Sequence, residues 1–137
     1  MKNILEEFGI NAGKIWETLN SQGPLTEAKL MQTTRLSDDE FYSAIGWLAR
    51  ENKICKDGMT YKLGETNLTD KIGANAGKIW TVLSTQKEVD ITSIAPLAQI
   101  DKRDAFCALG WLARENKIEP KLIPRARATQ IKIALKW

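Results

Sequence analysis

One stretch of this sequence occurs twice, and the repeat constrains the fold more than any other feature. The string NAGKIW occupies 11–16 and 75–80, and the string GWLARENKI occupies 46–54 and 110–118. Both pairs are offset by 64 residues, so the intervening material has the same length in both copies. Two long matches in one register indicate a duplicated unit.

The copies are predicted to be separate small domains within the 137 residues of the chain. The polar segment GETNLTD lies between them, and we place the boundary at Asn67. Unit one is then 1–67 and unit two is 68–137. We expect the two units to have the same helix order, with a small hydrophobic core in each.

The start of each unit predicts an amphipathic helix. Apolar residues recur at positions i, i+3, i+4 and i+7, which places them on one helix face. Gly23-Pro24 ends this helix in unit one. Because both tryptophans of the pattern lie on that stripe, we expect them in the core. The stripe is Ala12, Ile15, Trp16 and Leu19 in unit one, and Ala76, Ile79, Trp80 and Leu83 in unit two.

Two further helices follow in unit one. A short helix is predicted from about Thr26, with Leu30 facing inward. Ser37 is a typical N-cap with Glu40 three residues later, and the third helix then runs to about Glu51. Asn52 stands where a left-handed helix terminator is expected. The core stripe of the third helix is Phe41, Ala44, Ile45 and Leu48.

A β-hairpin completes each unit. In ICKDGMTYKL, two strand-like runs surround Asp57-Gly58, a strong signal for a two-residue turn. Unit two ends instead in IEPKLIPRARATQIKIALKW, which predicts strands at about 118–123 and 129–135 joined by the basic loop PRARA. Pro120 and Pro124 indicate an exposed edge strand. The predicted fold class is α+β, mainly α with small β-wings: two tandem winged helix-turn-helix units, each of three helices plus a hairpin.

The string LTEAKLMQTTRLSDDEFYSAIGWLARENKI resembles the winged helix-turn-helix superfamily, and NAGKIW with GWLARENKI is similar to a family of small prokaryotic winged-helix domains of unassigned function. The resemblance covers nearly the whole chain, once per copy. It implies a fold rather than one activity, since winged helices serve DNA binding and protein assembly alike. Two features depart from the pattern. Arg35 and Gln99 occupy a turn that usually has glycine, and Pro96 predicts a shortened or shifted second helix in unit two.

Composition argues against an enzyme. The chain has no histidine, which removes most nucleophilic triads and most zinc or iron ligand sets. No phosphate-binding glycine loop is present, and Cys55 and Cys107 are expected to be free thiols. We therefore predict no catalytic residue, no cofactor, no metal, and no polar pocket holding several strongly shifted titratable groups. The chain lacks a stretch that could span a bilayer and a signal peptide, so we expect a cytoplasmic protein without a membrane partner.

Basic side chains concentrate in unit two. Residues 1–67 hold 8 basic and 10 acidic side chains, net −2, whereas residues 68–137 hold 12 and 7, net +5. Basic wings commonly grip phosphates, and each neutralised phosphate adds salt-dependent affinity. Duplex DNA is therefore a predicted partner of this wing; the alternative is a solvated strand whose charges protect a sheet edge. The basic residues of the wing are Lys121, Arg125, Arg127, Lys132 and Lys136.

The third helix is the usual reader of the major groove. Unit one begins this helix with Asp38 and Asp39, which repel phosphates, whereas unit two has Lys102 and Arg103 at the matching positions. DNA binding is therefore predicted for unit two. The face opposite the core stripe carries Asp39, Ser43, Gly46 and Arg50 in unit one, and Arg103, Cys107, Gly110 and Arg114 in unit two.

The same face also suits contact with protein. Small residues flanked by aromatic ones form a shallow apolar trough, and a mid-helix glycine costs about 1 kcal/mol relative to alanine. Glycine in both copies therefore suggests close approach by the other copy, a second chain, or the first helix of the same unit. The tryptophans beside it either serve a protein interface or tuck under their own wings. The interface candidates are Tyr42, Gly46, Trp47, Phe106, Gly110 and Trp111.

Two functions stay open on the sequence alone. The first is a non-enzymatic tandem winged-helix protein, a regulator or chromosome-associated protein, that binds duplex DNA through the third helix and basic wing of unit two. The second is a protein-assembly module that uses the apolar face of the third helices for a homodimer or another partner. The predicted DNA-binding residues are Lys102, Arg103, Arg114, Lys121, Arg125, Arg127 and Lys132.

Overall fold

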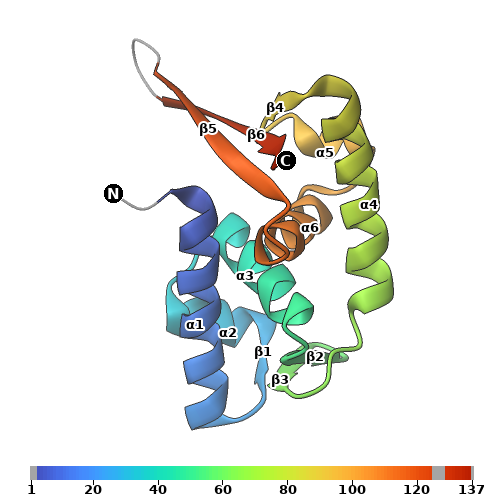
Figure 1. Cartoon of the computed structure of the whole chain (residues 1–137). Helices are drawn as coiled ribbons and strands as arrows, with labels where there is room; N and C mark the ends of the chain where they lie inside the picture. Colours follow the sequence, from blue (N-terminus) through green and yellow to red (C-terminus); the bar gives the residue numbers. More distant parts are fainter. Residues whose placement is uncertain (1–2, 125–128, 137) are drawn as a thin grey trace.

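The computed structural model describes residues 3–124 and 129–136, and it contains two winged helix-turn-helix units. Unit one consists of α1 (Ile4–Gln22), β1 (Leu25–Thr26), α2 (Glu27–Thr34), α3 (Asp38–Arg50), β2 (Ile54–Asp57) and β3 (Thr60–Leu63). Unit two consists of α4 (Thr69–Gln86), β4 (Glu88–Asp90), α5 (Ile94–Ala98), α6 (Lys102–Arg114), β5 (Ile118–Pro124) and β6 (Thr129–Leu135). The elements follow the same order in both units, which confirms the predicted fold class (Figure 1).

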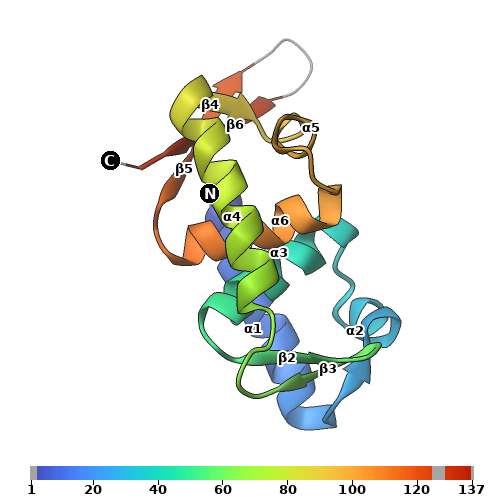
Figure 2. The same ribbon diagram turned by 90° about the vertical axis from the view of Figure 1, so that its right-hand side faces the viewer.

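The third helices, α3 and α6, lie side by side at the centre of the molecule (Figure 1 and Figure 2). The first helices flank this central pair, α1 on one side and α4 on the other. The two wings lie at opposite ends of the molecule, and the β5–β6 hairpin projects beyond the helices. The duplication therefore produces two units joined through their third helices.

Local capping rules determine where the helices of unit one begin and end. The side chain of Thr26 caps α2, and Ser37 forms the predicted capping box with Glu40 at the start of α3. Gly23 ends α1 with a φ of 80°, and Asn52 takes the predicted left-handed conformation with a φ of 60°. The predicted start of the second helix near Thr26, the capping box, the end of the first helix at Gly23 and the left-handed Asn52 are confirmed.

The turn before each third helix bends at a residue other than glycine. Arg35 follows α2 with a φ of 59°, and Gln99 follows α5 with a φ of 58°. A left-handed backbone at such residues costs on the order of 1–3 kcal/mol, which the surrounding structure must offset. These are the two positions where the superfamily usually has glycine, so the turn geometry is kept without it.

Each wing belongs to a three-stranded sheet. The strand orders are β1-β3-β2 and β4-β6-β5, with antiparallel pairing throughout. The sequence predicted both hairpins but missed β1 and β4, which have two and three residues and too short a pattern to detect. The strand β5 lies at the edge of its sheet, so no further strand pairs with its outer side. Pro120, which has no backbone N–H, is therefore tolerated there.

The second helix of unit two is shorter than its counterpart. Helix α5 has five residues whereas α2 has eight. Pro96 has no N–H to donate, so it fits only within the first turn of a helix. The helix therefore begins at Ile94, and residues 91–93 form a turn instead. The predicted shortening is confirmed, and it opens space described below.

The hydrophobic core is one continuous cluster that includes buried residues of both units. The prediction of two separate cores is therefore wrong, because the contact between α3 and α6 joins them. A second correction concerns Trp16 and Trp80, which are 37% and 44% exposed rather than buried. Ala12, Ile15 and Leu19 are buried as predicted, but Asn11 rather than Trp16 completes the buried face of α1 at this level. The buried side chains of α1 are Leu5, Phe8, Asn11, Ala12, Ile15 and Leu19.

Candidate functional site

Helices α3 and α6 cross with almost no space between their backbones. A Cβ atom added to Gly46 would lie 1.7 Å from the carbonyl oxygen of Cys107, and one added to Gly110 would lie 1.9 Å from that of Ser43. Gly46 and Gly110 are repeat-equivalent, as are Ser43 and Cys107, so the contact is reciprocal. Any side chain beyond a hydrogen at these glycines would force the helices apart.

The C-terminal ends of the two helices are joined by a second reciprocal arrangement. Arg50 Nε lies 3.0 Å from a carboxylate oxygen of Glu115, and Arg114 Nε lies 3.0 Å from one of Glu51. The two guanidinium groups also lie over the aromatic rings of the opposite unit, Arg50 at 5.6 Å from the centre of Trp111 and Arg114 at 5.9 Å from that of Trp47. Each arginine thus makes an ion pair and a cation–π contact across the units, and Arg114 also donates a hydrogen bond to Glu51.

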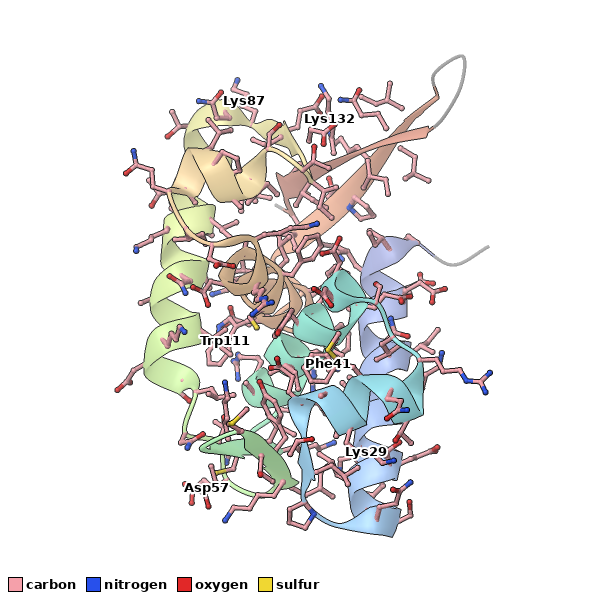
Figure 3. The ribbon with its side chains drawn as sticks, turned by 180° about the vertical axis from the view of Figure 1, so that it is seen from behind. Lys29, Phe41, Asp57, Lys87, Trp111 and Lys132 are labelled. Carbon is pink, nitrogen blue, oxygen red and sulfur yellow. The ribbon has the colours of Figure 1, made fainter. Side chains whose placement is uncertain are left out.

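Each tryptophan packs against the first helix of its own unit. A Cβ added to Gly9 on α1 would lie 2.9 Å from the Trp47 ring, and one added to Gly73 on α4 would lie 3.8 Å from the Trp111 ring. Figure 3 shows Trp111 toward the middle of the molecule rather than beneath a wing. Both rings are half-buried. They lie between their own first helix and an arginine of the other unit, an arrangement that the sequence did not predict.

The N-terminal end of α6 also faces unit one. Lys102 Nζ lies 3.3 Å from a carboxylate oxygen of Asp39, and the guanidinium of Arg103 lies 5.6 Å from the centre of the Tyr42 ring. With Arg114, three of the residues predicted to bind DNA therefore contact unit one instead of extending freely. Their charges are partly matched within the chain.

DNA binding through the third helix requires an open helix face, and the structure shows this face covered. Ser43 is fully buried, Gly46 and Gly110 are buried, and Tyr42 and Phe106 are 6% and 7% exposed. The sequence left three candidates for the group that approaches this face: the other copy, a second chain, or the first helix of the same unit. In the structure, the other copy covers both glycines. No room remains there for a DNA groove, a second chain or another partner unless the two units separate.

The wing of unit two carries the rest of the predicted basic site. Lys121 and Lys132 are paired across β5 and β6, and their ammonium groups lie 3.6 and 3.8 Å from the carboxylate of Glu88 on β4. Lys132 and Asp57 lie at opposite ends of the molecule, one on each wing (Figure 3). Lys136 Nζ donates to the side chain of Asn116 at 3.0 Å. Arg125 and Arg127 lie outside the described residues.

Beside the contact of α3 with α6 lies a cavity of about 440 Å³, called here the polar cavity, whose lining includes Glu27, Tyr42, Tyr61 and Cys107. Tyr42 and Tyr61 both donate to the carboxylate of Glu27, at 2.7 and 3.2 Å. Burial, together with this carboxylate, raises the pKa of both phenols above its ordinary value, and burial raises the pKa of Cys107 to about 12. The prediction that no polar pocket would hold several shifted groups is wrong.

The direction of these shifts bears on chemistry. A raised pKa keeps both phenols and the thiol protonated at neutral pH, whereas a nucleophile needs its pKa lowered. The two phenols therefore act as hydrogen-bond donors, the Cys107 thiol is unreactive, and none of the three groups acts as a base. Among the residues that the structure describes, no cluster of three or more histidine, cysteine or carboxylate ligands could hold a metal ion. None of the described helices is long and apolar enough to cross a membrane.

A second cavity, of about 700 Å³, was not predicted at all. We call it the apolar cavity, and it lies between α1 of unit one and the α5–α6 region of unit two. Its lining includes Asn11, a buried asparagine on the core side of an apolar helix. That asparagine and the helix-breaking Pro96 were the only signals of the cavity available in the sequence.

Comparison with known families agrees with this fold. A model of the winged helix-turn-helix domain (DUF2582) matches the chain twice, over residues 1–63 and 67–127. Searches of curated proteins and of solved structures found no match to this chain. The two matches cover most of the chain. The first spans the three helices and the wing of unit one, and the second spans the three helices of unit two and β5 but ends before β6. The chain therefore belongs to the winged helix-turn-helix domain (DUF2582) family, as a tandem pair.

Proposed function

We propose that this chain is a non-enzymatic, DNA-associated protein that holds duplex DNA by its phosphates through the wing of unit two. The observation that supports this proposal is the β5–β6 hairpin, which packs against the helices at its base and extends away from α1 and α6 at one end of the molecule (Figure 1). Residues 118–137 contain five basic side chains and one acidic side chain, net +4, whereas the chain as a whole is +3. The net positive charge therefore resides in this wing.

The proposed binding is independent of base sequence. A helix reads bases only by placing side chains into the major groove, and phosphate contacts carry no sequence information directly. In this chain the third-helix faces cover each other at Gly46 and Gly110. The wing is then the surface left for DNA, which fits an architectural or general regulatory role better than recognition of one operator.

The protein-assembly alternative loses the surface it needed. It required the apolar face of the third helices to receive a second chain or another protein. That face is occupied by the other half of the same chain, so the assembly it suits has already taken place within one molecule. We therefore favour DNA association over partner binding at this face.

Salt-titrated binding to duplex DNA tests the proposal. The variant Lys121→Gln/Lys132→Gln removes two described wing charges, and it should weaken binding and reduce the slope of log affinity against log salt by about 2. Duplexes of unrelated sequence should bind equally. Glu88→Gln removes the carboxylate that partly neutralises both lysines, so it should strengthen binding.

A matched variant controls for net charge. Lys29→Gln/Lys62→Gln removes the same two charges from exposed positions of unit one, far from the projecting hairpin. It should leave the salt slope near that of the unaltered chain. Equal losses from both double variants, or no duplex binding at low salt, would refute DNA association through this wing.

A further inference from the structure

The apolar cavity contains a buried amide with an unsatisfied donor. Asn11 is 2% exposed, and its Nδ2 has no hydrogen-bond partner among the residues that the structure describes. Leaving such a group unpaired costs stability, so most buried polar atoms in folded proteins find a partner. Asn11 lines the cavity, so a molecule inside it could supply the missing acceptor.

The walls around Asn11 are largely apolar. They include Ile4 and Phe8 from α1, Ile91 and Ala95 from the α5 region, and Phe106 from α6. A volume of about 700 Å³ lies within the range of about 300–1000 Å³ typical of small-molecule sites. An apolar hollow with one convergent polar group is the usual form of such a site.

The duplication supplies an internal comparison, because the polar cavity is the counterpart of this one. Each cavity lies between the helix-turn-helix of one unit and the first helix of the other. Where the polar cavity has Glu27 and Tyr42, joined by a hydrogen bond of 2.7 Å, the apolar cavity has Ile91 and Phe106. The polar network is thus present in one copy, and the other copy has apolar walls at the equivalent positions.

The shortened α5 creates part of the opening. Pro96 delays the start of that helix, so Ile91 and Thr92 lie in a turn that lines the cavity. This turn is well defined, because the backbone N–H and the hydroxyl of Thr92 both donate to Asp90 Oδ1, at 2.9 and 2.6 Å. In unit two the position of Met31 is taken by Ala95, whose smaller side chain leaves further space.

The charged residues in the lining restrict the ligand. Three carboxylates, those of Glu7, Asp39 and Glu40, and one ammonium group, that of Lys102, line the cavity. Lys102 already lies 3.3 Å from Asp39, so the excess charge is negative. An anionic ligand such as a nucleotide or a fatty acid would meet repulsion, whereas a neutral molecule or an amine would not.

We propose that the apolar cavity binds a small, mainly apolar molecule, neutral or positively charged, whose hydrogen-bond acceptor pairs with the Nδ2–H of Asn11. The ring of such a molecule lies between Phe8 and Phe106, and a cationic group lies toward Glu7 and Asp39. This site is separate from the basic wing, so it stands whether or not the chain binds DNA.

Three bicyclic compounds with the same substitution pattern test the proposal. An aminomethylquinoline has both the ring acceptor and the positive charge, an aminomethylnaphthalene lacks the acceptor, and a quinolinecarboxylic acid reverses the charge. Binding is measured by calorimetry and by the amide chemical shifts of the full chain. The aminomethylquinoline should bind best and perturb the amides around Asn11 and Ala95, and the acid should bind less tightly at low salt.

Two variants locate the site. Asn11→Ala should weaken binding of the aminomethylquinoline about tenfold and leave binding of the naphthalene unchanged. Asn75→Ala, the same substitution at the repeat-equivalent position, should weaken neither compound. Ala95→Met introduces the side chain that unit one has at this position, so it should fill the cavity and abolish binding without unfolding the chain.

Several outcomes would overturn the proposal. These are no binding of the amine at millimolar concentration, equal losses from Asn11→Ala and Asn75→Ala, or a naphthalene that loses as much affinity as the quinoline. Self-association of the unaltered chain that Ala95→Met abolishes would also overturn it. The cavity would then be an interface between copies rather than a ligand site.

Discussion

The substitution Gly46→Ala tests whether the contact of α3 with α6 holds the two units together. Its added Cβ would lie 1.7 Å from the carbonyl oxygen of Cys107 and 2.6 Å from the carbonyl carbon. Both atoms belong to backbone, so no side-chain rotation can relieve the clash. The helices must move apart, and the buried surface between them must open.

The expected loss of stability follows from two opposing effects. Overpacking a well-filled core costs typically about 1–3 kcal/mol, and a clash with backbone at this distance belongs at the upper end, about 3 kcal/mol. Alanine is better than glycine in a helix interior by about 1 kcal/mol, which offsets part of the loss. The net destabilisation is then about 2 kcal/mol, or roughly 6–10 °C in the melting temperature of a chain of this size.

Urea unfolding and thermal melting measure this difference, and the chain provides a matched control. Gly13 also lies within a helix, but a Cβ there would have no neighbour within 4 Å. Gly13→Ala should therefore stabilise the chain by up to about 1 kcal/mol. Opposite signs for the two substitutions are the expected result. A Gly46→Ala variant that is as stable as Gly13→Ala would refute the close crossing of α3 and α6.

Three further predictions concern charge and titration. Arg50→Gln should cost less than about 1 kcal/mol in urea unfolding, because its ion pair is partly exposed; a loss above about 2 kcal/mol would contradict this. Tyr42 and Tyr61 have raised pKa values in the folded chain, so the folded state retains protons that the unfolded state loses above about pH 10. Stability should therefore fall as pH rises through that region, and tyrosinate absorbance below pH 10 in the folded chain would argue against it. Iodoacetamide at pH 8 should label Cys55 before Cys107, whose pKa is raised to about 12, as peptide mass spectrometry can check.

Much of the fold could be predicted because its signals are local. The Ser37–Glu40 capping box and the hairpin turn depend on residues a few positions apart. The capping box was found where expected. The hairpin was also found, but its two turn residues are Gly58 and Met59, one position later than the predicted Asp57-Gly58, because Asp57 still pairs with Thr60. Pro96 likewise restricts its own helix through a missing N–H. Such rules need no knowledge of the neighbouring unit, so one sequence suffices to apply them.

The choice between Asn11 and Trp16 could not be made in the same way. Both residues flank the stripe of α1 that contains Ala12 and Ile15, and the periodicity permits either side to be buried. Hydropathy favoured the tryptophan, yet Asn11 is 2% exposed and Trp16 is 37% exposed. The position of unit two decides the matter, because it covers the side of α1 on which Asn11 lies and helps to enclose the apolar cavity there.

The charge difference between the third helices has an explanation that the sequence alone could not show. Two copies joined by a reciprocal contact bring equivalent positions close together, so an acidic start on both helices would place carboxylates against carboxylates. Unit one has Asp38 and Asp39, whereas unit two has Lys102 and Arg103, and Lys102 lies 3.3 Å from Asp39. At the C-terminal ends of the helices no such difference is needed, because both copies have an arginine followed by a glutamate. Arg50 pairs with Glu115 of the other unit, and Arg114 pairs with Glu51. The basic start of α6 therefore serves the contact between the units, and this removes it as an argument for DNA in the groove. The contact between α3 and α6 does not account for the basic residues of the unit-two wing. Support for DNA association therefore rests on that wing.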